Sequence, residues 1–351
     1  MTKAVMLAGR PVGPGQPTYV IAELSANHQH NLDHAIRIVH AAHQAGADAV
    51  KLQTYTADTM TIDADTPPFV IGEGTLWAGR RLYELYGEAA TPWEWHQPLL
   101  DAATELGLQL FSTPFDASAV AFLDAFDPPC FKIASFELVD LPLIREVASR
   151  GRTLIMSTGM ASEGEIDEAV FTAREGGAPG IVLLRCNSSY PAQPDEMDLR
   201  TIPAMAERWG VPVGLSDHTL GTVTATTAVA LGACVIEKHL TLRRSDGGPD
   251  AAFSLEPAEF ASMVSTVREC EAALGGVRYG PSDHERNSLA FRRSLFVVED
   301  MAAGETFTEH NVRVIRPADG IAPRHLPEVL GKRAAAAIRR GTPLDWALIS
   351  E

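Results

Sequence analysis

Short apolar runs alternate with amphipathic or alanine-rich stretches from about residue 19 to residue 275. Nearly every position in eight of these runs is apolar, which is typical of parallel strands buried on both faces of a sheet. The eight runs are 19–24, 49–52, 109–112, 130–134, 153–157, 181–186, 211–215 and 234–237. Helical patterns between them include 32–45, 93–106, 141–149, 163–175 and 222–231. Eight strands with helical crossovers predict an α/β fold of the TIM (β/α)8 barrel type.

A doubly wound open sheet is the alternative for the same alternation, but no Gly-x-Gly-x-x-Gly motif follows any predicted strand to favour it. The segment 4–7 is expected to form a hairpin that closes the bottom of the barrel. We predict a barrel domain at 1–278, a linker at 279–291 and a second domain of short strands at 292–351. Sixty residues with few aromatic side chains make a small core, so this domain is expected to dock on another surface.

The amino-acid composition limits the classes of function that the protein can have. Forty-five acidic residues against twenty-nine basic ones give a net charge of -16, which argues against nucleic acids and anionic membranes as partners. No apolar run approaches the roughly eighteen residues of a transmembrane helix, and the N-terminus lacks the apolar core of a signal peptide. The four cysteines form no Cys-x-x-Cys pair and are expected to be free thiols. These features predict a cytoplasmic protein.

One predicted connection is unusually long. About forty residues separate the second strand from the helix that begins near Thr91, and they include Trp77, Tyr83 and Tyr86. Connections of this length inside a compact domain are usually lids or binding loops, and a surface excursion without a role is the alternative.

Polar side chains follow the predicted strands. All eight carboxyl ends of a TIM barrel meet at one face, where active sites lie. A polar residue can simply mark the end of a strand, but two lysines, two histidines and two glutamates at the same level favour an active site. The polar strand ends are Glu23, Lys51 with Gln53, Ser112 with Thr113, Lys132 with Ser135, Ser157 with Thr158, Asn187 with Ser188, Ser216 to His218, and Glu237 to His239.

The alternation of side chains along a strand shows which residues at two of these strand ends share a face. Glu237 and His239 share one face of the last strand, with Lys238 on the other, and Ser216 and His218 share a face of its neighbour. Two imidazoles at one level with a carboxylate below predict an incompletely coordinated divalent metal ion that acts as a Lewis acid. Such ligands suit Mn²⁺, Zn²⁺ or Fe²⁺.

Lys51 and Lys132 end the second and fourth predicted strands. Two ammonium groups among hydroxyls predict a cradle for phosphate or carboxylate. Schiff-base chemistry at one lysine is the alternative, and two lysines beside a metal favour the anion. Glu23 is a candidate general base or an acceptor for a sugar hydroxyl. The surrounding hydroxyls are those of Thr113, Ser135, Ser157 and Ser188.

Taken in order, the motifs at these strand ends resemble the sialic acid synthase family over nearly the whole chain. The tail from Ser294 to Ile349 resembles the antifreeze-like (SAF, β-clip) domain of the same family. The motifs are Ile21-Ala22-Glu23, Ala26-Asn27-His28, Lys51-Leu52-Gln53-Thr54, Ser112-Thr113-Pro114-Phe115, Phe131-Lys132-Ile133-Ala134-Ser135, Ser157-Thr158-Gly159-Met160, Gly214-Leu215-Ser216-Asp217-His218-Thr219 and Glu237-Lys238-His239.

Within the family the resemblance is strongest to the pseudaminic acid synthases. Leu24-Ser25-Ala26-Asn27-His28 stands where the N-acetylneuraminate and legionaminate enzymes usually have Ile-Gly-x-Asn-His. Ser188 takes the place of an asparagine that neuraminate synthases use near the substrates, so the equivalent contact is expected to differ. N-acetylneuraminate or legionaminate synthase is the alternative within the family. A metal-dependent class II aldolase and a non-catalytic carbohydrate-binding protein are the alternatives outside it.

The resemblance implies condensation of phosphoenolpyruvate with 2,4-diacetamido-2,4,6-trideoxy-L-altrose to give pseudaminic acid and phosphate. It implies a metal ion on His218 and His239, with Mn²⁺ expected, Mg²⁺ or Co²⁺ as alternatives, and Glu237 as a further ligand directly or through water. It also implies a domain-swapped homodimer in which Arg316 reaches the barrel mouth of the partner. The substrate-binding residues that it implies are Lys51, Gln53, Thr113, Phe115, Lys132, Ser135, Ser157, Ser188, Tyr190, Ser216, Asp250 and Arg316.

Overall fold

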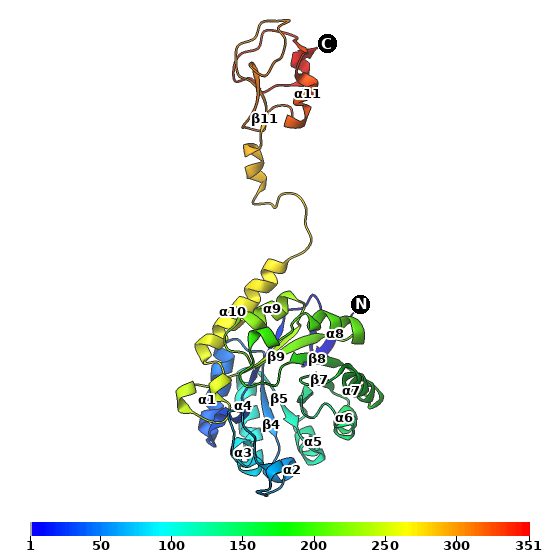
Figure 1. Ribbon diagram of the computed structural model, residues 1–351, viewed down its shortest axis with the longest axis vertical. Coiled ribbons are helices and arrows are strands. Elements are labelled where there is room, and N and C mark those ends of the chain that lie inside the picture. The colour runs from blue at the N-terminus through cyan, green and yellow to red at the C-terminus, as the bar shows by residue number, and fades with distance from the viewer. Residues whose placement is uncertain (1) are drawn as a thin grey trace. The chain divides into compact units, whose positions relative to one another are not determined.

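The computed structural model describes residues 2–351 and divides into two compact units, one up to Gly275 and one from Gly276 to Glu351 (Figure 1). Among the described residues, no helix combines the length and apolar character needed to cross a bilayer. All four cysteines are unpaired, as the sequence predicts. The two units are described in turn.

The first unit is built on eight parallel strands, which confirms the predicted barrel. Their order in the sheet is β5-β4-β3-β10-β9-β8-β7-β6, and the edge strands β5 and β6 lie in contact, so that the sheet is nearly closed. The strands are β3 (Tyr19–Glu23), β4 (Ala49–Thr54), β5 (Gln109–Pro114), β6 (Cys130–Ile133), β7 (Thr153–Ser157), β8 (Ile181–Cys186), β9 (Val213–Asp217) and β10 (Val235–His239).

A principal helix follows each strand, and these helices surround the barrel (Figure 1). Several of them begin at side-chain caps that satisfy the free backbone amides of the first turn: Asn31 caps α1, Asp116 caps α5, and Ser162 forms a capping box with Glu165 at α7. The helices are α1 (Leu32–Gln44), α4 (His96–Glu105), α5 (Ala117–Asp124), α6 (Leu141–Ala148), α7 (Glu163–Glu175), α8 (Thr201–Trp209), α9 (Val223–Ala230) and α10 (Pro257–Leu274).

The predicted hairpin at the bottom of the barrel is confirmed. Strands β1 (Val5–Leu7) and β2 (Arg10–Val12) pair antiparallel. Leu7 and Val12 are fully buried against barrel-lining side chains such as Tyr19 and Phe111, so the hairpin seals the amino-terminal end of the barrel. The functional site must therefore lie at the opposite end, where the strands finish.

The long connection after β4 has structure of its own. It contains α2 (Ala57–Met60), the 3-10 helix η2 (Pro67–Phe69), α3 (Leu82–Ala89) and the 3-10 helix η3 (Trp93–Trp95). Backbone hydrogen bonds join Ile71 to Arg80 and Gly79 to Ile71, which makes residues 71–80 a tight loop. The remaining 3-10 helices of this unit are η1 (Ser25–His28), η4 (Pro194–Glu196), η5 (Arg244–Asp246) and η6 (Ala251–Phe253).

The second unit has its own small core, formed by side chains that include Leu295, Val297, Phe307, Val312 and Leu344. Its elements are η7 (Arg286–Phe291), β11 (Ser294–Val297), β12 (Val312–Ile315), η8 (Pro323–His325), α11 (Leu326–Val329), β13 (Arg333–Ala334), η9 (Trp346–Leu348) and β14 (Ile349–Ser350). Strands β11 and β12 pair antiparallel, as do β13 and β14.

Behind the strand ends, a buried ion pair joins β9 to β10 on the outer face of the barrel. Lys238 Nζ lies 2.8 Å from Asp217 Oδ2 and also donates to the Thr219 carbonyl, and both charged side chains are fully buried. Lys238 therefore points away from the barrel interior, as the alternation predicts. Asp217 Oδ1 also accepts hydrogen bonds from Thr219, so the pair holds the segment that follows β9.

Replacing Lys238 with methionine is expected to lower the free energy of unfolding by about 3–5 kcal/mol, because Asp217 would remain as a buried charge without a counter-charge. The double change Asp217→Asn with Lys238→Met should recover much of this loss, since it removes both charges. Urea denaturation followed by circular dichroism measures the difference. Equal stability of the Lys238→Met protein and the wild type would contradict this role of the pair.

Candidate functional site

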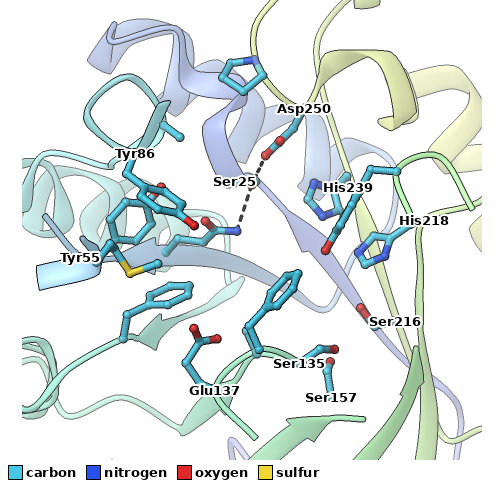
Figure 2. A pocket seen from close by; sticks show the side chains of 18 of the residues that line it. Ser25, Tyr55, Tyr86, Ser135, Glu137, Ser157, Ser216, His218, His239 and Asp250 are labelled. Carbon is cyan, nitrogen blue, oxygen red and sulfur yellow. Dashed lines mark hydrogen bonds between the residues drawn. The ribbon is translucent and has the colours of Figure 1, made fainter. Parts of the chain in front are cut away.

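The carboxyl ends of the barrel strands surround a cavity of about 320 Å³. Figure 2 shows His218 and His239 on one side of this cavity and Tyr55 and Tyr86 on the other. Its polar lining residues are Ser25, Lys51, Gln53, Lys132, Ser135, Glu137, Ser157, Ser216, His218, Glu237, His239 and Asp250. Most of the predicted site residues therefore meet in one place, although they come from seven different strands or the loops that follow them.

The two histidines lie at the same level. Strands β9 and β10 pair with Lys238 opposite Asp217, so His239 at the end of β10 and His218, the first residue after β9, are neighbours. Their ring centroids are 5.3 Å apart. His218 Nδ1 lies 2.8 Å from the Asn187 carbonyl oxygen, which can only accept, so Nδ1 carries the hydrogen and Nε2 keeps the lone pair in the neutral ring.

These residues fit a pair of metal ligands. His239 Nδ1 is buried without a hydrogen-bond partner among the described residues. Burial, reinforced by the positive charge of nearby side chains such as Lys51, lowers the pKa of His239 well below its usual value, so its ring is neutral, the form that binds metals. Across residues 2–351, no three His, Cys, Asp or Glu side chains are grouped as a metal site.

Glu237 lies between the lysines. Its Oε1 is 3.9 Å from Lys51 Nζ and 3.7 Å from Lys132 Nζ, and it accepts a hydrogen bond of 3.0 Å from Ser216. Burial alone would raise the pKa of Glu237, but the two ammonium groups bring it below its usual value. Its Oε2 is buried without a partner among the described residues. The predicted contact of Glu237 with a metal stays a prediction, and it would have to use this second oxygen.

Lys51 and Lys132 are both buried at the floor of the cavity. Lys132 Nζ donates to Ser157 Oγ at 2.6 Å, and Lys51 Nζ donates to Thr113 Oγ1 at 3.3 Å. Lys51 also forms an ion pair with Glu23. Burial lowers the pKa of Lys132, whereas the nearby carboxylates of Glu23 and Glu237 outweigh burial and raise the pKa of Lys51.

Glu23 lies beneath the cavity lining and is almost fully buried. Burial raises its pKa to about 7, against the opposing effect of Lys51. A carboxyl group that titrates near neutral pH can exchange protons during a reaction, which suits the predicted acid or base role. Gln53 Nε2 lies 3.4 Å from Glu23 Oε1 and so connects this carboxyl group to the cavity wall.

Aromatic side chains form much of the remaining wall. Tyr55 packs against Phe115 and Tyr86 with ring centroids 5.0 and 5.9 Å away. On the opposite side, Tyr190 lies 4.4 Å from His218 and 5.6 Å from Trp77, measured between ring centroids. Much of the upper wall is therefore aromatic, while Lys51, Lys132 and Glu237 bring charged groups to the floor.

The long connection after β4 supplies part of this apolar wall. Met60, Ile71, Trp77 and Tyr86 all line the cavity, and Trp77 Nε1 donates to the Pro249 carbonyl at 3.0 Å. Tyr83, named above with Trp77 and Tyr86 in this connection, does not share the wall. Its hydroxyl group donates to Asp58 outside the cavity, because α3 turns this side chain away from Tyr86.

Four other predicted site residues lie outside the cavity lining. Glu23 and Thr113 touch Lys51 from below, and Ser188 lies behind the lining, with Oγ 4.0 Å from Cys186 Sγ. Arg316 lies in the second unit, is exposed, and forms no ion pair among the residues that the structure describes. Its predicted role in a partner's site stays a prediction.

The sequence reasoning missed several lining residues, among them Glu137, Cys186 and Phe253. Burial raises the pKa of Glu137 to about 7. Burial alone would raise the pKa of the Cys186 thiol, but His218 beside it lowers the value to about 7. Glu137 follows Ser135 by two residues, and a search of the loops beyond the strand ends would have found it.

Comparisons with known proteins agree with this site. The NeuB family matches residues 38–279, and the SAF domain matches residues 292–350. The chain is 43% identical over 326 residues to a pseudaminic acid synthase of Campylobacter jejuni, covering 93% of this chain and 95% of that protein. It is 42% identical over 332 residues to the pseudaminic acid synthase of Helicobacter pylori, covering 94% and 97% of the two chains.

A solved structure of a related enzyme has a similar fold. The N-acetylneuraminic acid synthetase of Leptospira borgpetersenii matches with a TM-score of 0.73 and 29% identity, covering 82% of this chain and 96% of that one. The barrel and the second unit thus correspond to two recognised domains in the order expected from the sequence. The chain belongs to the NeuB family of sialic acid synthases and carries a C-terminal SAF domain.

Proposed function

We propose that this enzyme is a pseudaminic acid synthase that condenses phosphoenolpyruvate and water with 2,4-diacetamido-2,4,6-trideoxy-L-altrose, giving pseudaminic acid and phosphate. The observation that carries the proposal is the division of the cavity into a charged floor and an aromatic upper wall. Its floor holds two buried lysines beside the two histidines, and its upper wall is aromatic. The similarity to two pseudaminic acid synthases over more than nine-tenths of the chain supports this acceptor.

The floor suits phosphoenolpyruvate. Lys51 and Lys132 would hold its phosphate and carboxylate, and the hydroxyls of Ser135, Ser157 and Ser216 line the same space. Charge-assisted hydrogen bonds of this kind are strong in a buried site, and they fix the plane of the enol before it reacts. The ammonium group of Lys51 is already paired with Glu23 and Glu237, so the incoming anions would compete with these carboxylates for it.

The amino sugar would lie above, against the aromatic wall and within reach of His218 and His239. A divalent metal ion on these two imidazoles, with Mn²⁺ expected, would supply a Lewis acid for the aldehyde oxygen of the open-chain sugar. In the reaction, C3 of the enol attacks the aldehyde carbon, water adds to C2, and phosphate leaves with cleavage of its C–O bond. Glu23 is buried below the floor, and its pKa is raised to about 7, so it would take up or release a proton there during the reaction.

We also propose that the protein acts in the cytoplasm as a domain-swapped homodimer. Arg316 is exposed and unpaired among the described residues, whereas the barrel site must bind an anionic substrate in a chain of net charge -16. A guanidinium group from a partner would add positive charge and a planar pair of donors at the mouth, which a lysine could not provide in the same geometry.

The acceptor is tested by offering phosphoenolpyruvate together with each candidate amino sugar and measuring phosphate release. We expect the altrose derivative to react fastest. The C6 hydroxyl of N-acetylmannosamine meets an apolar wall, which rejects an added hydroxyl by only about a hundredfold, so slow turnover of this sugar is expected. Faster turnover of N-acetylmannosamine would contradict the proposed acceptor, and turnover without phosphate release would favour an aldolase.

A further inference from the structure

Ser25 has an unusual backbone for a serine. It begins η1 just beyond the end of β3, and its φ angle is 47°, in the left-handed region where a side chain is crowded by the following carbonyl. Seven described non-glycine residues have a positive φ, and Ser25 is the one among them that lines the cavity. Strain of this kind persists where the surrounding structure holds the residue in place, and it is concentrated at functional sites.

The Ser25 hydroxyl joins two other cavity residues. It donates to Asp250 Oδ2 (Figure 2) and accepts a hydrogen bond of 3.0 Å from Gln53 Nε2. Asp250 lies in the loop after β10 and Gln53 at the end of β4, so the hydroxyl connects side chains from three separate parts of the barrel. Asp250 Oδ2 has one further partner among the described residues, the Ala26 amide at 3.3 Å.

The position of the three residues links them to the acceptor. They lie beside the aromatic wall, and Ser25 itself is 1% exposed, so water does not compete freely for its hydroxyl. Without that hydroxyl, the Asp250 carboxylate and the Gln53 amide could each rotate to other partners. An enzyme distinguishes one amino sugar from another by the directions in which its side chains meet the hydroxyl and acetamido groups of the sugar.

We propose that Ser25 is a specificity-determining positioning residue for the acceptor sugar. Its hydroxyl fixes the directions of the Asp250 carboxylate and the Gln53 amide, so that these two groups present one set of hydrogen-bond partners to the sugar. The inference rests on the proposed function and adds to it the residue that sets part of its selectivity. The strained backbone is the consequence of placing a hydroxyl group at this point.

The test compares Ser25→Gly with Ser25→Ala. Both remove the hydroxyl, but glycine relieves the left-handed backbone while alanine keeps it, so Ser25→Gly should be the more stable of the two. In both, kcat/KM for the altrose derivative should fall by roughly tenfold to a hundredfold, the range expected for a lost hydrogen bond to a charged group. The change should appear chiefly as a higher KM for the sugar, with the KM for phosphoenolpyruvate nearly unchanged.

Ala8→Gly is the matched control. Ala8 has a φ of 52° and lies in the turn between β1 and β2, at the sealed end of the barrel. Glycine there relieves similar strain and should leave both KM values and the preference over N-acetylmannosamine as they are in the wild type. In Ser25→Gly, that preference should shrink.

The outcomes separate the two proposals. Unchanged sugar KM and unchanged preference in both Ser25 variants, with an active wild type, would overturn the role of Ser25 and leave the proposed function standing. An equal rise in both KM values would also overturn it, because the hydroxyl would then support the whole site. A wild type that releases no phosphate with any of the amino sugars would remove the proposed function itself.

Discussion

Removal of divalent metal is expected to abolish phosphate release, and Mn²⁺ is expected to restore it. The reason is the pair formed by His218 and His239, which lie at one level at the ends of adjacent strands and line the cavity. Among the described residues that line the cavity, Lys51 and Lys132 are the two lysines, and their own partners hold them at the floor. Turnover is measured after dialysis against a chelator and again after each ion is added back.

A binding measurement makes this prediction independent of activity. Replacing His239 with glutamine should weaken binding of Mn²⁺, followed by the paramagnetic resonance signal of the free ion, by at least about tenfold. His43→Gln is the control, because His43 is an exposed histidine at the end of α1. Full activity in metal-free protein, or equal Mn²⁺ binding by the His239→Gln and His43→Gln proteins, would show that the pair does not hold a metal.

Homodimers of Arg316→Ala and of Lys132→Ala should each be nearly inactive, whereas mixed dimers of the two should regain activity. If Arg316 serves the partner's barrel, one site of a mixed dimer carries both changes and the other carries neither. Recovery should then approach about half of the wild-type activity per mixed dimer, as two-fold symmetry requires. Phosphate release is measured on mixed dimers isolated with two different affinity tags.

Arg313→Ala is the matched control for this experiment. Arg313 is an exposed arginine on β12, three residues before Arg316, and its homodimers should keep their activity. Absence of recovery in mixed dimers, once exchange of subunits has been verified, would show that Arg316 does not complete the site of a partner.

The sequence alone predicted the barrel because its signal is local and repeated. Each of the eight apolar runs overlaps one of the eight parallel strands, although the seventh begins at Val213 and not at residue 211. The pairing of His218 with His239 could also be predicted, since alternation along a strand and the even register of parallel neighbours are enough to place two side chains at one level. The sealed amino-terminal end followed from the short apolar segment before β3.

Only the tertiary structure decided which side chains lie next to each charged group. Glu237 was expected one layer below the histidines, and the structure adds Lys51 and Lys132, whose Nζ atoms lie 3.9 and 3.7 Å from its Oε1 because β4 and β6 direct them across the floor. The pKa of Glu23, raised to about 7, depends on burial and on Lys51, neither of which a sequence position records.

The loops show most clearly what could not be predicted from the sequence. Tyr83 and Tyr86 are three residues apart on α3, yet one faces Asp58 and the other lines the cavity, because the packing of α3 sets the direction of each side chain. Ser25 and Asp250 meet across 225 positions of the chain. Periodicity places residues within a strand and between paired strands. The contacts of loops depend on how distant segments pack, and this is why the sequence determined the barrel and its ring of polar ends, while only the folded chain decided which of them act together.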